Sequence, residues 1–155
     1  MATSAVPAAV DALLAILQAA PALSGVSVLD GPPAVDLAVP DFVAVGWVPD
    51  TDVAVDITQA FASAGARTRD EDFAITCWAE SWTGDNDVAA RRRRVFALLA
   101  AVEDALRATN SAPTAPTLNG TVLWAGMTRG TYQQALTDRG VRTGIAFTVT
   151  CRARI

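Results

Sequence analysis

The side chains that could do chemistry in this chain are carboxylates, arginines and two cysteines, because the 155-residue sequence contains no His and no Lys. Without His, Ser–His and Cys–His nucleophile pairs and His-ligated metal sites are excluded. Without Lys, Schiff-base chemistry and the P-loop lysine are excluded as well. Most enzyme classes therefore become unlikely, and we predict no catalytic residue, no metal and no cofactor.

The densest charge cluster is the run Asp70-Glu71-Asp72, which follows Arg67 and Arg69. Three carboxylates could form an oxygen-only magnesium or calcium site. Because successive strand residues point to opposite faces, at most two of the three can converge. We therefore expect a solvated strand start, with a salt-bridge patch between subunits as the alternative.

A second group of acids, Asp50, Asp52 and Asp56, has a superficial likeness to a calcium-binding loop. The spacing lacks the glycine at the sixth position and the terminal glutamate that such a loop needs. We predict no metal site there.

Four consecutive arginines, Arg91 to Arg94, fall within a predicted helix and sweep about 300° of its circumference. They cannot share one face, so at least one must cover apolar surface with its stem or reach a carboxylate. The run could bind phosphate, contact another protein or form a solvated helix face. Acidic residues on the same helix partly neutralise it: Asp85, Asp87, Glu103 and Asp104.

Trp78 and Trp82 share one face of a predicted strand with Glu80. Trp is enriched in the hot spots of protein interfaces, so the pair could anchor a partner. The alternative is ordinary core beneath a helix. The two cysteines, Cys77 and Cys151, are expected to be buried free thiols, and a disulfide is possible only if their strands are neighbours.

Charge is distributed unevenly along the chain. Residues 1–66 hold seven Asp and no Arg, whereas residues 67–155 hold nine acids and all 12 Arg, within a net charge of -4. This asymmetry predicts an acidic and a basic surface on one small body, unless the two sets interleave and cancel. The acidic balance argues against sequence-independent nucleic-acid binding. We also expect no membrane contact, because no apolar run approaches the roughly 18 residues of a membrane span.

Hydrophobic periodicity predicts two helices, over residues 5–20 and 83–108, the second capped by Asp85 or Asn86. Alternation predicts strands over 26–30, 42–48, 72–82, 121–134 and 141–154, and weakly favours a strand over a short helix within 49–68. Gly140 is expected to take a positive φ in a hairpin turn.

This order predicts one α+β domain over residues 1–155. Its expected architecture is a single, mostly antiparallel sheet of four to five strands with two helices packed on one face. The strand over 72–82 and the last two strands should form the centre of the sheet. Phe73, Ile75, Cys77 and Ala79 should face the core.

Assembled in order, these features resemble the siphophage tail terminators, a family also described as tail completion or minor tail proteins. The resemblance follows the N-terminal amphipathic helix, VSVLDG at 26–31, DFVAVG at 41–46, RDEDFAITC at 69–77, the helix AARRRRVFALLAAVE at 89–103, and PTLNGTV at 116–122 before a closing strand. It covers almost the whole chain, except that residues 32–65 match least. The Arg- and Ala-rich, Lys-free composition resembles that of phages whose hosts have GC-rich genomes.

The resemblance implies a small domain that assembles into a hexameric ring in the virion, at the head-proximal end of the tail. Such a ring caps the tail tube, stops its polymerisation and meets the head-side connector or stopper protein. DNA would pass through the lumen without specific binding, and the family has no catalytic residues to carry over.

A ring needs two different complementary patches on each copy. We expect Arg91, Arg92, Arg93 and Arg94, with Trp78 and Trp82, to contact neighbouring subunits. Acids of the first half, Asp36, Asp50 and Asp52, should line the lumen.

Three alternatives stay open: a head–tail connector or head-completion protein, a small hydrolase that uses Asp and Glu alone, and a monomeric ligand-binding domain.

Overall fold

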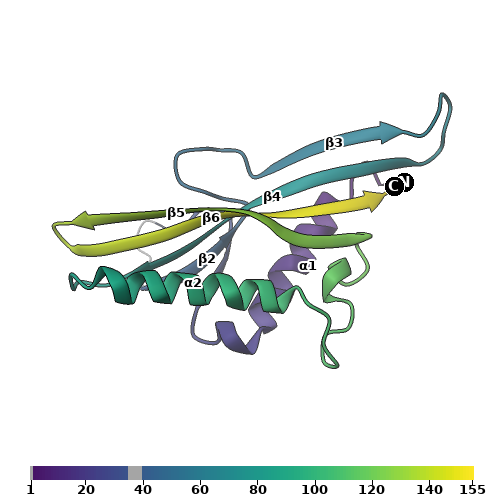
Figure 1. The fold of residues 1–155 in the computed structure, drawn as a ribbon. Coiled ribbons are helices and arrows are strands. Elements are labelled where there is room, and N and C mark those ends of the chain that lie inside the picture. Colours follow the sequence, from purple (N-terminus) through teal and green to yellow (C-terminus); the bar gives the residue numbers. More distant parts are fainter. Residues whose placement is uncertain (1, 35–39) are drawn as a thin grey trace.

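The computed structural model describes residues 2–34 and 40–155, which form one six-stranded sheet with two helices below it (Figure 1). The elements are α1 (Val6–Ala19), β1 (Ser27–Asp30), β2 (Asp41–Val45), β3 (Val55–Phe61), β4 (Arg69–Trp82), α2 (Val88–Ala105), β5 (Trp124–Thr137) and β6 (Gly140–Arg154). Short 3₁₀ turns follow each helix, at Pro21–Leu23 and Ala115–Thr117. The α+β class is as predicted, but the sheet has more strands than the expected four to five.

The sheet follows the order β1-β2-β4-β6-β5, and β3 also pairs with β4, along its first half. The pairings are antiparallel except for β1 with β2, which run parallel. β4 and β6 occupy the centre as predicted, since thirteen residue pairs join them. The expectation that β5 is also central was wrong, because within the described part of the chain β5 pairs only with β6 and forms one edge.

The main core lies between the sheet and the helices. α1 contributes Leu13 and Leu17, and α2 contributes Val95, Leu98 and Val102. The sheet contributes the inward-facing side chains of the central strands, as the alternation predicted: Phe73, Ile75, Cys77, Ala79, Ile145, Phe147, Val149 and Cys151. Each is almost completely buried, so this face holds the helices and sheet together.

The termini of α2 and of the β5–β6 hairpin depend on specific residues. Asp87, and not Asp85 or Asn86, is the N-cap of α2, and its carboxylate accepts from the amide of Ala90 at 3.0 Å. Asp85 accepts instead from the amide of Asp87 at 3.1 Å. Gly140 has φ of 121°, as predicted for the hairpin, and a Cβ there would overlap the carbonyl oxygen of Thr83.

Candidate subunit interface

The four consecutive arginines of α2 divide into two pairs. Arg94 Nε donates to Asp41 Oδ2 at 2.8 Å, and an Arg91 Nη atom donates to Ser81 Oγ at 2.9 Å. Ser81 Oγ in turn donates to the other oxygen of Asp41 at 2.6 Å. This network joins α2 to β2 and β4, which confirms that at least one arginine reaches a carboxylate. Arg91 and Arg94 are thus held within their own chain.

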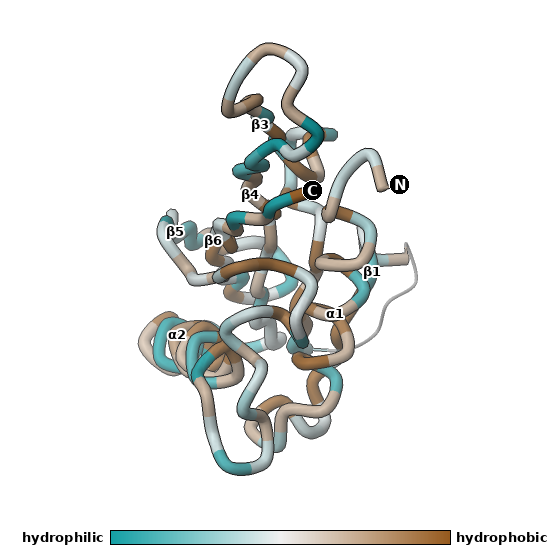
Figure 2. The backbone as a smooth tube through the Cα atoms, turned by 90° about the vertical axis from the view of Figure 1, so that its right-hand side faces the viewer, coloured by the Kyte–Doolittle hydropathy of each residue, from teal (hydrophilic) through white to brown (hydrophobic). Residues whose placement is uncertain are grey.

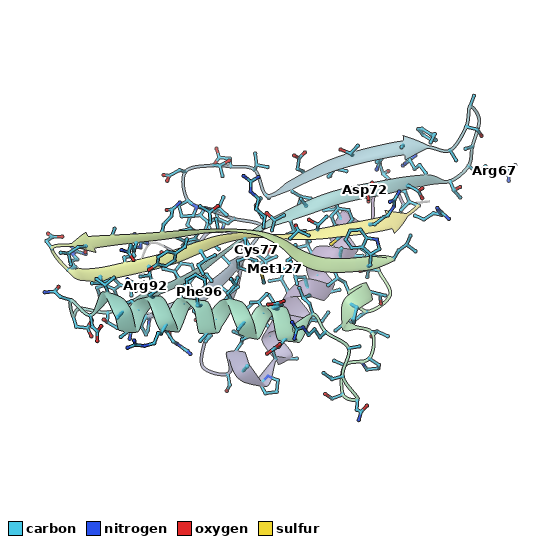
Figure 3. All side chains as sticks on the ribbon, in the orientation of Figure 1. Arg67, Asp72, Cys77, Arg92, Phe96 and Met127 are labelled. Atoms are coloured by element: carbon cyan, nitrogen blue, oxygen red, sulfur yellow. The ribbon has the colours of Figure 1, made fainter. Side chains whose placement is uncertain are left out.

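Arg92 and Arg93 remain exposed and make no ion pair with any described residue. Phe96 lies one turn further along α2, so it neighbours both on the helix surface. Its ring packs on Tyr132 of β5, with 5.4 Å between ring centroids. Arg92 and Phe96 lie along α2 beneath the β5–β6 hairpin (Figure 3).

The two tryptophans have different environments. Trp78 is only 4% exposed and packs with Phe42 and Ala44 in a second, smaller cluster. That cluster lies on the face of the sheet away from the helices, so Trp78 is not core beneath a helix. Residues from the chain's own strands and loops cover it: Leu29, Trp47, Val48 and Ala146. Its indole is thus not at the surface, contrary to the predicted contact with a neighbour.

Trp82, by contrast, is 37% exposed at the end of β4 and remains available to a partner. Between the two tryptophans, the buried Glu80 accepts from Trp78 Nε1 at 3.2 Å and from Arg142 Nε at 2.8 Å. The ion pair between Glu80 and Arg142 links the Trp78 indole to β6. Trp78 is therefore part of the subunit's own structure, whereas Trp82 is exposed.

The carboxylate run separates onto two faces, as strand geometry requires. Asp70 and Asp72 form a ladder with arginines of β6: Arg154 Nε lies 2.7 Å from Asp70, and Arg152 Nε lies 3.6 Å from Asp72. The hydrogen bond from Arg154 holds the pKa of Asp70 below its ordinary value. The salt bridges are thus made inside one chain.

Glu71, on the opposite face, is completely buried, so the expected solvated strand start was wrong at this position. Its carboxylate accepts from the amide of Ala5, at 2.8 Å, and from the side-chain amide of Gln59. It therefore satisfies one amide at the N-terminus of α1, where the N-cap residue Ala5 has no side chain that can cap and Ser4 Oγ accepts from the amide of Val6. No group of three potential metal ligands occurs among residues 2–34 and 40–155.

Two of the three acids that were predicted to line the lumen lie in the part of the chain that the structure describes. Asp50 and Asp52 are exposed in the segment between β2 and β3, and neither makes an ion pair with a described residue. Asp56, on β3, is likewise exposed and unpaired within that part of the chain. Asp36 lies outside the described residues.

Two groups of exposed charges lie on opposite flanks of the sheet, although Arg67, in the connection after β3, is an exposed arginine on the same side as the acidic group (Figure 3). The acidic flank comprises Asp50, Asp52 and Asp56, on β3 and the segment before it. The basic flank comprises Arg92, Arg93 and Arg129, on α2 and β5. β3 and β5 lie at opposite ends of the row β3-β4-β6-β5 (Figure 2). The sequence predicted charge asymmetry, and the fold separates these unpaired charges in space.

Exposed apolar side chains accompany both flanks, which sequence reasoning had missed. On the β3 side these are Val53, Ile57 and Phe61, and on the β5 side Phe96, Leu123, Trp124 and Leu136. A soluble monomer rarely exposes so many large apolar side chains together, so these flanks are candidates for protein contact.

The cysteines cannot supply a reactive site. Cys77 and Cys151 lie on the paired strands β4 and β6, yet both are free and buried, as predicted. Burial raises the pKa of each thiol to about 12. Both therefore stay protonated near neutral pH, where a thiol is a poor nucleophile.

A groove of about 670 Å³ opens between the C-terminal ends of α1 and α2. Seven of its sixteen lining residues are alanine, and its charged residues Asp104 and Arg107 pair with each other at 3.3 Å. A ligand site needs convergent polar groups that are free to bind. This groove therefore lacks the free, convergent polar groups of a ligand site.

Comparison of the chain with known protein families and with curated proteins finds no match in either. Among the described residues, neither helix is both long enough and apolar enough to cross a membrane.

Proposed function

We propose that this chain is a structural protein of a phage virion that forms a ring of six copies at the head-proximal end of the tail. The ring caps the tail tube, ends its polymerisation and joins the tail to the head-side connector or stopper. The proposal starts from the resemblance of the ordered sequence motifs to the siphophage tail terminators.

The observation that carries the proposal is the separation of the acidic flank from the basic flank across one sheet. A closed ring is built from heterologous contacts, in which two different patches of each copy meet their counterparts on the neighbours. Opposite charge on the two flanks favours head-to-tail contact and disfavours contact between identical flanks. Exposed apolar side chains on both flanks supply area to bury.

Within this proposal, the exposed Arg92, Arg93 and Trp82 contact neighbouring subunits. Of the acidic flank, Asp56 on β3 meets the neighbour, whereas Asp50 and Asp52, in the segment before β3, face the lumen, where their negative charge keeps DNA from adhering as it passes. Arg91 and Arg94 have a different part, since their bonds to Ser81 and Asp41 fix α2 on the sheet and so hold the exposed pair in position.

The test uses tail tubes polymerised from the tube protein of the same virion, with and without this chain. The proposal expects shorter tubes when the chain is present, with gold-labelled chain at one end only in electron micrographs. Label along the whole tube, or unchanged tube lengths, would contradict it. Binding to portal or adaptor proteins without binding to tubes would instead support a head–tail connector.

A further inference from the structure

We infer that β3 of one copy pairs with β5 of the next in antiparallel orientation, so that the sheet continues from subunit to subunit. This inference rests on the proposed ring and specifies the partner of each flank, which is a second copy of the chain. The inference adds a backbone contact between subunits, which neither the charge of the flanks nor the family resemblance predicts.

Both strands present a free edge. β3 pairs only with β4, and β5 pairs only with β6, among residues 2–34 and 40–155. Their outer N–H and C=O groups are therefore unpaired, which makes each edge a template for another strand. β3 is seven residues long and β5 fourteen, so β5 can accommodate β3 along its full length.

The direction of the pairing follows from the topology. β3 is antiparallel to β4, β4 to β6, and β6 to β5, so β3 and β5 run in opposite directions within one chain (Figure 1). A rotation about an axis along the strands leaves strand directions unchanged. Neighbours in a ring around such an axis therefore bring β3 against an antiparallel β5.

The exposed apolar side chains select a register. Phe61 and Ile57 are four residues apart on β3, and Leu123, the residue just before β5, is four residues from Met127 on that strand. Ile57 pairs with Phe73 and Met127 with Val149, so both point to the helix side of the sheet. Placing Phe61 opposite the neighbour's Leu123 also places Ile57 opposite its Met127. Phe61 and Leu123 are 60% and 53% exposed in the single chain, and this register covers both.

The other face of the sheet agrees with the same register. Asp56 then lies beside Thr128 and Arg129 of the neighbour, where a bulge turns Arg129 to the side of Thr148. The pairing thus joins one member of the acidic flank to one member of the basic flank. Ala60 lies opposite Trp124, whose exposed indole gains a small neighbour on which to pack.

The register is also compatible with closure. Within one chain Ile57 stands level with Ala125, through its partner Phe73 and that residue's partner Cys151. The neighbour's Met127 lies two residues further along, a shift of about 7 Å. A shift of this size between subunits is what a modest tilt of the strands in a closed ring produces.

Disulfide trapping tests the pairing, because the native thiols are buried and will not interfere. Thr58→Cys with Gly126→Cys, and Ala60→Cys with Trp124→Cys, place the new thiols directly opposite across the interface. A Cβ at Gly126 meets no atom within 4 Å, so that substitution fits the fold. Thr58→Cys with Thr131→Cys is the off-register control, and Asp56→Cys with Trp124→Cys tests the parallel alternative. Within one chain β3 and β5 are separated by two strands, about 14 Å, which is too far for a disulfide.

After mild oxidation, the first two variants should convert most monomer on non-reducing gels into a ladder that ends in a closed species. The other two variants should remain largely monomeric. Dimers of Thr58→Cys alone, or equal yields from all four pairs, would overturn the β3–β5 pairing. Annular hexamers without any disulfide would overturn this pairing but leave the ring, whereas a monomer at every concentration would overturn both.

Discussion

The six-membered ring of Trp78 lies directly over the backbone of Gly144, on the strand paired with its own. Glu80 is the register partner of Gly144 and accepts a hydrogen bond from the same indole. Only a residue without a side chain fits at this position, because a Cβ on Gly144 would overlap the Trp78 ring. The second core cluster, on the face away from the helices, depends on this contact.

Replacement Gly144→Ala should therefore destabilise the fold. Overpacking of a filled site typically costs about 1–3 kcal/mol, and here the ring must move from under its covering residues. Urea unfolding followed by tryptophan fluorescence measures the loss. Gly126→Ala is the matched control, since that position is open, and equal stability of the two variants would contradict the Trp78 packing.

Replacement Glu71→Ala should loosen the start of α1. The amide of Ala5 and the side chain of Gln59 would lose their buried acceptor, at a cost of about 2 kcal/mol. Hydrogen exchange of the first turn of α1 should speed up, while exchange in α2 stays unchanged. Asp72→Ala, at an exposed position on the other face, is the comparison. Identical exchange in the two variants would show that Glu71 does not hold the helix.

Alkaline pH should destabilise the fold through the cysteines. Their pKa is about 12 in the folded chain but about 9 when unfolded, so between these values the unfolded chain releases protons that the folded chain keeps. The free energy of unfolding therefore falls as pH rises above 9, by on the order of 1 kcal/mol per pH unit for each thiol. Cys77→Ala should flatten this dependence in denaturant titrations at several pH values. An unchanged slope would rule out the buried thiol as its source.

Charge reversal Arg92→Glu should weaken assembly and leave the subunit folded. Arg92 is exposed and makes no contact that the described fold needs, unlike Arg94, which bonds Asp41. Sedimentation at increasing salt, with circular dichroism for the fold, separates the two effects. Arg107→Glu, two residues beyond the end of α2, makes the same charge change at a residue whose ion pairs are with Glu103 and Asp104 of its own chain. Equal assembly of the two variants would remove Arg92 from the interface.

Alternation along the sequence predicted the inner faces of β4 and β6, because every second residue of a half-buried strand must be apolar. The same logic favoured a strand within residues 49–68 only weakly, and β3 confirms it, although most of its side chains are exposed. It could not give the parallel pairing of β1 with β2, since alternation carries no information on strand direction. The existence of a β3 edge was therefore only weakly predicted.

Only part of the candidate interface could be predicted from the sequence, because contacts between residues far apart in the chain decide the rest. The sweep of four arginines required them to separate, but only the positions of Asp41 and Ser81 decide that Arg91 and Arg94 turn inward. Trp78 and Trp82 were indistinguishable in sequence, and the difference arises because residues distant along the chain, including Trp47, cover only Trp78. The buried Glu71 was equally hidden, since its partner Ala5 lies 66 residues away.

The most direct test of the central claim is the mass of the purified chain in solution, measured by light scattering alongside negative-stain microscopy. The account predicts six copies of the 16.1 kDa chain, about 97 kDa, that appear as an annulus with a central hole. A single 16 kDa species at every concentration, with or without tail tubes, would contradict it.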